Sequence, residues 1–279
     1  METGINLLGE WKANEREIIK NLPILRSETN VEAIHDTRVA IKKLRAYYEL
    51  LNELDKPAKI DLPQTKSLFD ILGKHREWDI ILKHLQKSPD DLSELCPLFV
   101  SHIRQAKDQI SYLIKNALGV YTINEVEEVS KRIEELIRTM TLHKAADDCK
   151  KIIMQHVIKL KKQSIHFKKD PHDTRKSLKV IFYWISLFPP ETLYSNKQVK
   201  QMDVFLDKLG KWHDLLILFK KIKNYRKDYL AKSLNEYQIL KKLEDDIKTR
   251  CDKLFNKLNP GMIMNEFESQ SGYIVKTKA

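Results

Sequence analysis

The chain has 279 residues, of which 42% are hydrophobic and 32% are charged, so it can bury a sizeable core in one large domain or two halves. Its 7 glycines disfavour a protein of strands and tight turns and favour a nearly all-helical, all-α chain. With 50 lysines and arginines against 39 acidic residues, the net charge is +11. This excess indicates a polyanionic partner such as nucleic acid, an anionic membrane surface or a phosphate polymer, although a lysine-rich proteome would give the same charge.

Three cysteines, Cys96, Cys149 and Cys251, are scattered along the chain. They form neither a Cys-x-x-Cys pair nor a disulfide framework, which favours a reducing compartment. The N-terminal residues carry charges and lack the apolar run of a signal peptide. No stretch approaches the roughly 20 apolar residues that a membrane span needs. We therefore expect a cytoplasmic protein that does not enter a membrane.

Apolar periodicity predicts helices along most of the chain. The first helix is predicted over residues 5–22, with its end at Pro23. Thr29 and Glu32 have the spacing of a capping box, which predicts the start of a second helix that continues to Leu54.

Start and stop signals organise the remaining helices. Gly73 marks either a break or a tight helix contact, and Asp170 followed by Pro171 predicts a helix that runs to Phe188. Short connections predict antiparallel neighbours, and hence two helical bundles side by side in one compact body. The other helices are predicted over residues 64–72, 76–86, 92–118, 124–140, 142–167, 197–209, 212–223 and 227–258, and the tail 261–279 has no predicted element.

Two short motifs occur twice at one spacing. The sequence His-Asp-Thr-Arg occupies residues 35–38 and returns 137 residues later at 172–175. The pattern Asp-x-Leu-Gly-Lys at residues 70–74 returns with the same offset at 207–211. Two matches at one offset predict an internal duplication.

A duplicated core should preserve mostly apolar positions, yet this duplication keeps a histidine, an arginine and lysines. Such polar groups are costly to keep in place without a polar task. The boundary between the halves is expected near residues 119–124, which predicts a first helical-bundle repeat over 1–120 and a second over 121–260.

Each His-Asp-Thr-Arg motif starts a narrow cationic stripe along its helix. With about 100° per residue, the four groups of the first stripe lie within an arc of about 80°. Stacked like charges repel by about 0.2–0.5 kcal/mol per pair, so a stripe that occurs twice indicates an anion that neutralises it. A single stripe is ordinarily a solvated surface, but the repetition and the apolar neighbours favour a helix whose stripe faces a cleft. The stripes contain His35, Arg38, Lys42 and Arg45, and then His172, Arg175 and Lys179 with Lys176 beside them.

These motifs resemble those of a known family. The sequence from His35 to Arg45 is similar to the His-x-x-Arg-Val-x-x-Lys-Lys-Leu-Arg signature of the CHAD family, the conserved-histidine α-helical domain. The sequence from Leu72 to Asp79 resembles that family's Leu-Gly-x-x-Arg-Asp-x-Asp motif, with Glu77 in place of the usual aspartate. The resemblance covers about residues 5–260.

The resemblance implies two four-helix bundles related by a pseudo-twofold axis, with a basic cavity between them. It also implies a protein that binds inorganic polyphosphate without turning it over, which would connect a cytoplasmic location with polyphosphate granules. The chain lacks the Glu-x-Glu-x-Lys pattern of the triphosphate-processing domain that often accompanies the family, so it resembles a stand-alone member. The resemblance implies no catalytic residue, metal or cofactor.

Twelve residues carry over as expected polyphosphate ligands. Val180 and Phe182 stand where the family often has further basic residues, so we expect the second half of the binding surface to be weaker or asymmetric. His213 occupies the position that corresponds to Arg76. The expected ligands are His35, Arg38, Lys42, Lys43 and Arg45 from the first His-Asp-Thr-Arg helix, His172, Arg175, Lys176 and Lys179 from the second, and Lys74, Arg76 and Lys211 from the other motif.

Two other functions remain open at this stage. His-Asp pairs at 35–36, 172–173 and 213–214 are compatible with a metal-dependent phosphohydrolase, although neighbouring arginines and lysines oppose a divalent cation. A helical nucleic-acid-binding protein would fit the charge, but no RNP, KH, zinc-finger or helix-turn-helix signature is present. Competition between polyphosphate and RNA or DNA would distinguish these ligands.

Overall fold

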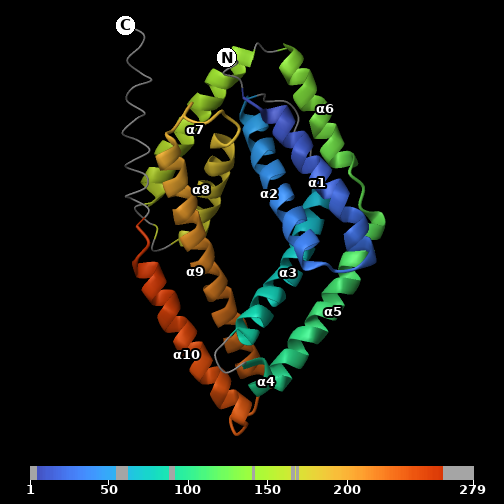
Figure 1. The fold of residues 1–279 in the computed structure, drawn as a ribbon, viewed down its shortest axis with the longest axis vertical. Coiled ribbons are helices and arrows are strands. Elements are labelled where there is room, and N and C mark those ends of the chain that lie inside the picture. The colour runs from blue at the N-terminus through green and yellow to red at the C-terminus, as the bar shows by residue number, and fades with distance from the viewer. Residues whose placement is uncertain are drawn as a thin grey trace.

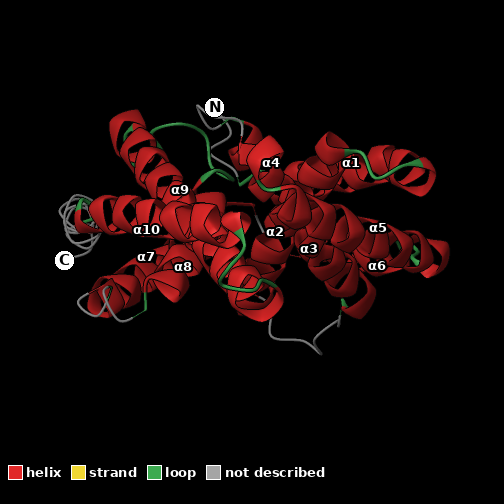
Figure 2. Ribbon diagram, turned by 90° about the horizontal axis from the view of Figure 1, so that it is seen from below, coloured by secondary structure: helices red, strands yellow, loops and turns green. Residues whose placement is uncertain are grey.

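The computed structural model describes residues 5–54, 62–87, 92–139, 142–164, 167 and 170–259. The fold is all-α, as predicted, and no strand occurs within these residues (Figure 2). The described helices are α1 (Leu7–Ser27), α2 (Val31–Leu54), α3 (Pro63–Gln86), α4 (Leu92–Leu95), α5 (Pro97–Val120), α6 (Asn124–Thr139), α7 (Leu142–Ser164), α8 (Pro171–Ile185), α9 (Asn196–Tyr229) and α10 (Asn235–Asn256).

The helices pack in two groups that lie side by side (Figure 1). In the first group, α1 packs on α2, α5 and α6, while α3 packs on α2 and α5. In the second group, α7 packs on α8, α8 on α9, and α9 on α10. The groups meet where α2 contacts α7 and α8 and where α3 contacts α9. The four helices that carry the repeated motifs therefore lie at the junction.

The first helix after the predicted boundary between the repeats packs on the first helix group. α6 begins at Asn124, within the residues expected to belong to the second repeat, and it packs on α1 and α3 of the first group. The duplication, the pseudo-twofold relation and the division at residues 120 and 121 stay predictions. The observed fact is that α2 meets α8 and α3 meets α9, so helices with matching motifs are neighbours.

One apolar core cluster includes side chains from both groups. Trp11 and Trp184 are among its largest fully buried side chains. The indole N–H of Trp11 donates to the carbonyl of Val126 at 3.3 Å, and that of Trp184 donates to the carbonyl of Ala46 at 2.6 Å. Both indoles thus satisfy their one polar atom inside the core.

Two glycines do not interrupt their helices. α3 continues through Gly73, and α9 continues through Gly210 as far as Tyr229. The two pairs of shorter helices predicted in these regions were therefore wrong, and α10 starts at Asn235, later than predicted. One interior glycine costs a helix only about 1 kcal/mol, which the packing of a long helix can offset.

Prolines also differ from their predicted effects. α1 passes through Pro23 to Ser27, and Leu22 and Leu25 on its buried face hold it in place. The helix predicted over residues 92–118 is divided into α4 and α5, because Pro97 begins a new helix after Cys96.

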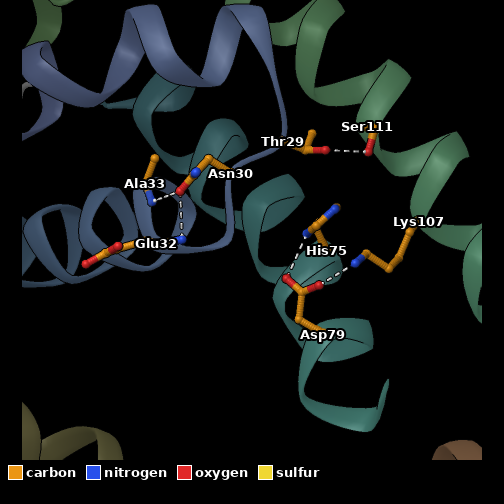
Figure 3. Close-up of polar contacts among 8 residues, drawn as sticks. All are labelled: Thr29, Asn30, Glu32, Ala33, His75, Asp79, Lys107 and Ser111. Carbon is orange, nitrogen blue, oxygen red and sulfur yellow. Dashed lines mark hydrogen bonds and ion pairs between the residues drawn. The ribbon is translucent and has the colours of Figure 1, made fainter. Parts of the chain in front are cut away.

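The start of α2 is capped by a different residue from the predicted one (Figure 3). The side-chain oxygen of Asn30 accepts hydrogen bonds from the backbone N–H groups of Glu32 and Ala33, each at 3.0 Å. Thr29, the predicted cap, instead accepts a hydrogen bond from the hydroxyl of Ser111 at 3.2 Å. The cap is shifted by one residue, in agreement with the stronger preference for asparagine than for threonine at the start of a helix.

The predicted cap of α8 is confirmed. The carboxylate of Asp170 accepts a hydrogen bond from the backbone N–H of Asp173 at 3.1 Å, and the helix ends at Ile185, before the predicted Phe188. Among the described helices, none is long and apolar enough to cross a membrane. The tail 261–279 lies outside the described residues.

Candidate anion-binding cleft

A cleft of about 570 Å³ lies at the junction of the two helix groups. Side chains from four helices line it, and most of the charged ones are cations. Apolar groups, among them Ile80, Tyr183 and Ile217, form the rest of the surface. The charged and imidazole groups are His35, Arg38, Lys42, Arg45 and Glu49 of α2, Arg76 and Glu77 of α3, His172, Arg175, Lys176 and Lys179 of α8, and His213 and Asp214 of α9.

Nine of the twelve expected ligands line this cleft, and three do not. Lys43, Lys74 and Lys211 are outside its lining. Lys43 and Lys74 each follow a lining residue by one position, which turns them about 100° away on the helix. Lys211 is exposed and lies 3.6 Å from the carboxylate of Asp207.

The Arg38 side chain is held by its own chain. Its guanidinium carbon lies 4.1 Å from the centroid of the Phe69 ring, and Nη1 donates a hydrogen bond to the carbonyl of Phe69. A Cβ atom at Gly73 would lie 2.5 Å from that Nη1. Gly73 therefore marks a tight contact, one of its two predicted meanings, and the absent side chain leaves room for Arg38.

Phe69 is central to one wall of the cleft, although no sequence motif predicted it as a site residue. Besides Arg38, the cations of Arg45 and Lys42 lie 5.5 and 5.9 Å from the centroid of its ring. A cation near an aromatic face is attracted by the ring quadrupole. Phe69 stands four positions before Gly73 on the same helix, and this spacing is the signal that could have found it.

The wall formed by α8 has a different character, and its cations act on Lys42 of α2. Arg175 has a fully buried Nε atom with no hydrogen-bond partner among the described residues. Burial, followed by the charges of Arg38 and Arg175, lowers the pKa of Lys42 to about 8. Burial and the charge of Arg175 also lower the pKa of Lys179. These cations repel one another across the cleft, and an anion between them would relieve that repulsion.

Two histidines of the cleft lining stack on one another. The rings of His172 and His213 have centroids 5.3 Å apart and planes inclined by 15°. Burial, with Arg175 and His172 as the next causes, lowers the pKa of His213 to about 4. Burial and neighbouring cations also lower the pKa of His35 and of His172. These imidazoles therefore gain charge at lower pH than the pH of about 6–7 typical of histidine.

Comparison with known proteins identifies the family. The sequence profile of the CHAD domain matches residues 7–219. The chain belongs to the CHAD family. A crystal structure of the CHAD domain from the plant Ricinus communis is similar in fold, with a TM-score of 0.72 and 15% identity over 96% of this chain and 93% of that one. No curated protein matches the chain by sequence.

The last aspartate of the CHAD-like motif does not line the cleft. Asp79 and His75 are buried in α3, and the Asp79 carboxylate lies 3.1 Å from His75 Nδ1 and 2.5 Å from Lys107 Nζ (Figure 3). Burial would raise the pKa of Asp79, but the hydrogen bonds from His75 and Lys107 outweigh it, so the pKa is lowered. This residue connects α3 to α5.

Three carboxylates interrupt the cationic lining of the CHAD cleft. Glu77 lies 3.5 Å from Lys221, which compensates its charge. Burial raises the pKa of Asp214 against the opposing effects of nearby arginines, and burial also raises the pKa of Glu49. Among the described residues, no group of three histidine, cysteine, aspartate or glutamate side chains is arranged to hold a metal ion.

Proposed function

We propose that this CHAD protein binds inorganic polyphosphate in the cleft and does not turn it over. The observation that carries the proposal is the convergence of Lys42, Arg175 and Lys179 from two helix groups on one partly buried space. Membership of a family associated with polyphosphate binding supports the choice of this anion.

The proposed ligand suits these groups chemically. Polyphosphate carries about one negative charge per phosphate, a density comparable to that of a nucleic acid backbone. Displacement of its counterions by lysines and arginines would give strong binding that weakens as salt rises. The guanidinium of an arginine can bind two phosphate oxygens at once, whereas a lysine acts as a point charge.

The form of the cleft supports a preference for a slender anion. The cations lie inside a space between α2, α3, α8 and α9, whereas a stacking surface for nucleic acid bases would need exposed aromatic faces beside the backbone track. Phe69 is already covered by Arg38, and the His172 and His213 rings face each other. We therefore expect polyphosphate to bind more tightly than single-stranded RNA or DNA of equal charge.

The proposal is tested by a titration of the purified protein with long-chain polyphosphate at two salt concentrations, with single-stranded RNA and DNA as competitors. Tight, salt-sensitive binding that nucleic acid does not displace is expected, with no release of phosphate over hours. Equal binding of all polyanions would contradict the ligand. Phosphate release that requires a divalent cation would contradict the absence of turnover and favour the phosphohydrolase.

A further inference from the structure

The two arginines of the duplicated motif lie in different surroundings. The offset of 137 residues pairs each residue around Arg38 with one around Arg175. Both arginines are followed by a leucine-glycine-lysine sequence on the neighbouring helix. Three residues before that sequence, the first repeat has an aromatic residue and the second does not. The three matching pairs are Arg38 with Arg175, Phe69 with Leu206, and Gly73 with Gly210.

The guanidinium of Arg38 already has interaction partners within the protein. One face of its guanidinium covers the Phe69 ring, and Nη1 donates to the carbonyl of the same residue. The missing side chain of Gly73 admits the guanidinium to the surface of α3. These contacts fix α2 against α3 and use part of the fork that would otherwise bind a phosphate.

Arg175 is free of such contacts. Leu206 has no ring on which a guanidinium could stack, and a Cβ atom at Gly210 would meet nothing within 4 Å. The buried Nε of Arg175 has no hydrogen-bond partner among the described residues. A buried donor without a partner is unfavourable and is expected to be satisfied by a ligand.

The neighbours of Arg175 complete an anion site. The positive charge of Arg175 contributes, with burial, to a lowered pKa at three neighbours. They are Lys42 of α2, Lys179 of its own helix and His213 of α9. Asp214 also lies close enough to interact with Arg175. Burial raises the pKa of this carboxylate, and the charge of Arg175 opposes that rise. Arg175 of α8 and Lys42 of α2 thus act on one another across the junction of the two helix groups.

We propose that Arg175, and not Arg38, is the phosphate-binding arginine, and that Arg38 is a positioning residue that holds α2 so that Lys42 faces Arg175. This inference rests on the proposed function and names the part of the cleft that carries it out. It reverses the sequence-based expectation, because the second repeat then supplies the stronger half of the site.

Paired variants test this division of tasks. Arg175→Gln should weaken binding of long-chain polyphosphate by about tenfold or more and reduce the salt dependence by about one phosphate contact, with the melting temperature of the free protein unchanged. Arg38→Gln should lower the melting temperature and weaken binding less, with the salt dependence unchanged. Arg38→Lys retains the charge without the planar fork, so it should not restore the melting temperature.

The matched glycines supply the control. Alanine in place of an interior helical glycine gains up to about 1 kcal/mol, so Gly210→Ala should raise the melting temperature. Gly73→Ala should melt at a lower temperature than Gly210→Ala, because only the first alanine would displace an arginine from its partners. An equal loss of salt dependence in Arg38→Gln and Arg175→Gln, with equal melting temperatures, would overturn the inference. If the unaltered protein bound no polyphosphate, the proposed function and the role of Arg175 would both be wrong, and the melting temperatures would still decide the role of Arg38.

Discussion

Trp184 of α8 donates its indole N–H to the backbone carbonyl of Ala46 in α2 at 2.6 Å. Ala46 is buried and follows Arg45, the last residue of the first cationic stripe. The same pair of helices therefore forms both the core junction and part of the cleft, whose lining includes Ala46. Packing between the two helix groups and the geometry of the cleft depend on one another.

Trp184→Phe tests this junction. The variant keeps an aromatic ring but leaves the buried carbonyl of Ala46 without its partner, which should lower the free energy of unfolding by about 1–3 kcal/mol. Urea denaturation at neutral pH measures the change. An unchanged midpoint and slope would show that this hydrogen bond does not hold α2 and α8 together.

Asp79→Asn removes the charge that pairs with Lys107 between α3 and α5. Loss of one partner of a buried ion pair should destabilise the protein by about 3–5 kcal/mol, while polyphosphate affinity stays unchanged because Asp79 lies outside the cleft lining. A parallel loss of affinity at temperatures where the variant is folded would contradict this structural role.

The pH dependence of stability provides a second measure of Asp79. Its pKa is lower in the folded state, so its contribution is complete above the unfolded value of about 3.9 and is lost as the pH falls through the folded value. The stability difference between the protein and Asp79→Asn should therefore shrink below about pH 4. A difference that is constant from pH 7 to pH 3 would contradict the assignment.

Polyphosphate binding should strengthen in acid. A bound polyanion favours protonated groups, so the pKa of His213 must rise from its free value of about 4, and binding takes up protons between the free and bound values. His35, His172 and Asp214 contribute in the same direction, and deprotonation of Lys42, with a pKa of about 8, weakens binding at alkaline pH. Calorimetry in buffers of different ionisation enthalpy measures the uptake, and binding without uptake at pH 5–6 would contradict it.

Glu49→Gln should strengthen binding. Glu49 places a carboxylate in the lining of the cleft, where it repels a polyanion. Glu53 stands one helical turn later, pairs with His156 at 2.7 Å and is absent from the lining, so Glu53→Gln is the matched control. A several-fold gain at low salt for Glu49→Gln alone is expected, and equal gains for both variants would indicate only a change in net charge.

Much of the fold and part of the cleft were accessible from sequence because they depend on local patterns. Periodicity and low glycine content predicted an all-α chain, and spacing along one helix face predicted the cations of α2 and α8. The role of Gly73 could not be predicted from local patterns. Whether it breaks a helix or admits a contact is decided by Arg38 from another helix, which no local pattern specifies.

The unequal roles of Arg38 and Arg175 were also inaccessible for a physical reason. Both arginines end the same His-Asp-Thr-Arg sequence, and the difference comes from Phe69 and Leu206 on neighbouring helices. Likewise, Lys43 and Lys74 fit the family motif, but their helical phase directs them away from the cleft lining. Side-chain surroundings, rather than motif membership, separate these residues.

The most direct test of cleft binding compares two triple variants of equal charge. One replaces Lys42, Arg175 and Lys179 with glutamate, and the other replaces Lys43, Lys74 and Lys211, which lie outside the cleft lining. Polyphosphate titrations are run on both, with circular dichroism to verify the helices. We expect the first variant to lose binding and the second nearly to retain it. Equal losses would show that polyphosphate is held by the general positive charge of the protein and not by the cleft.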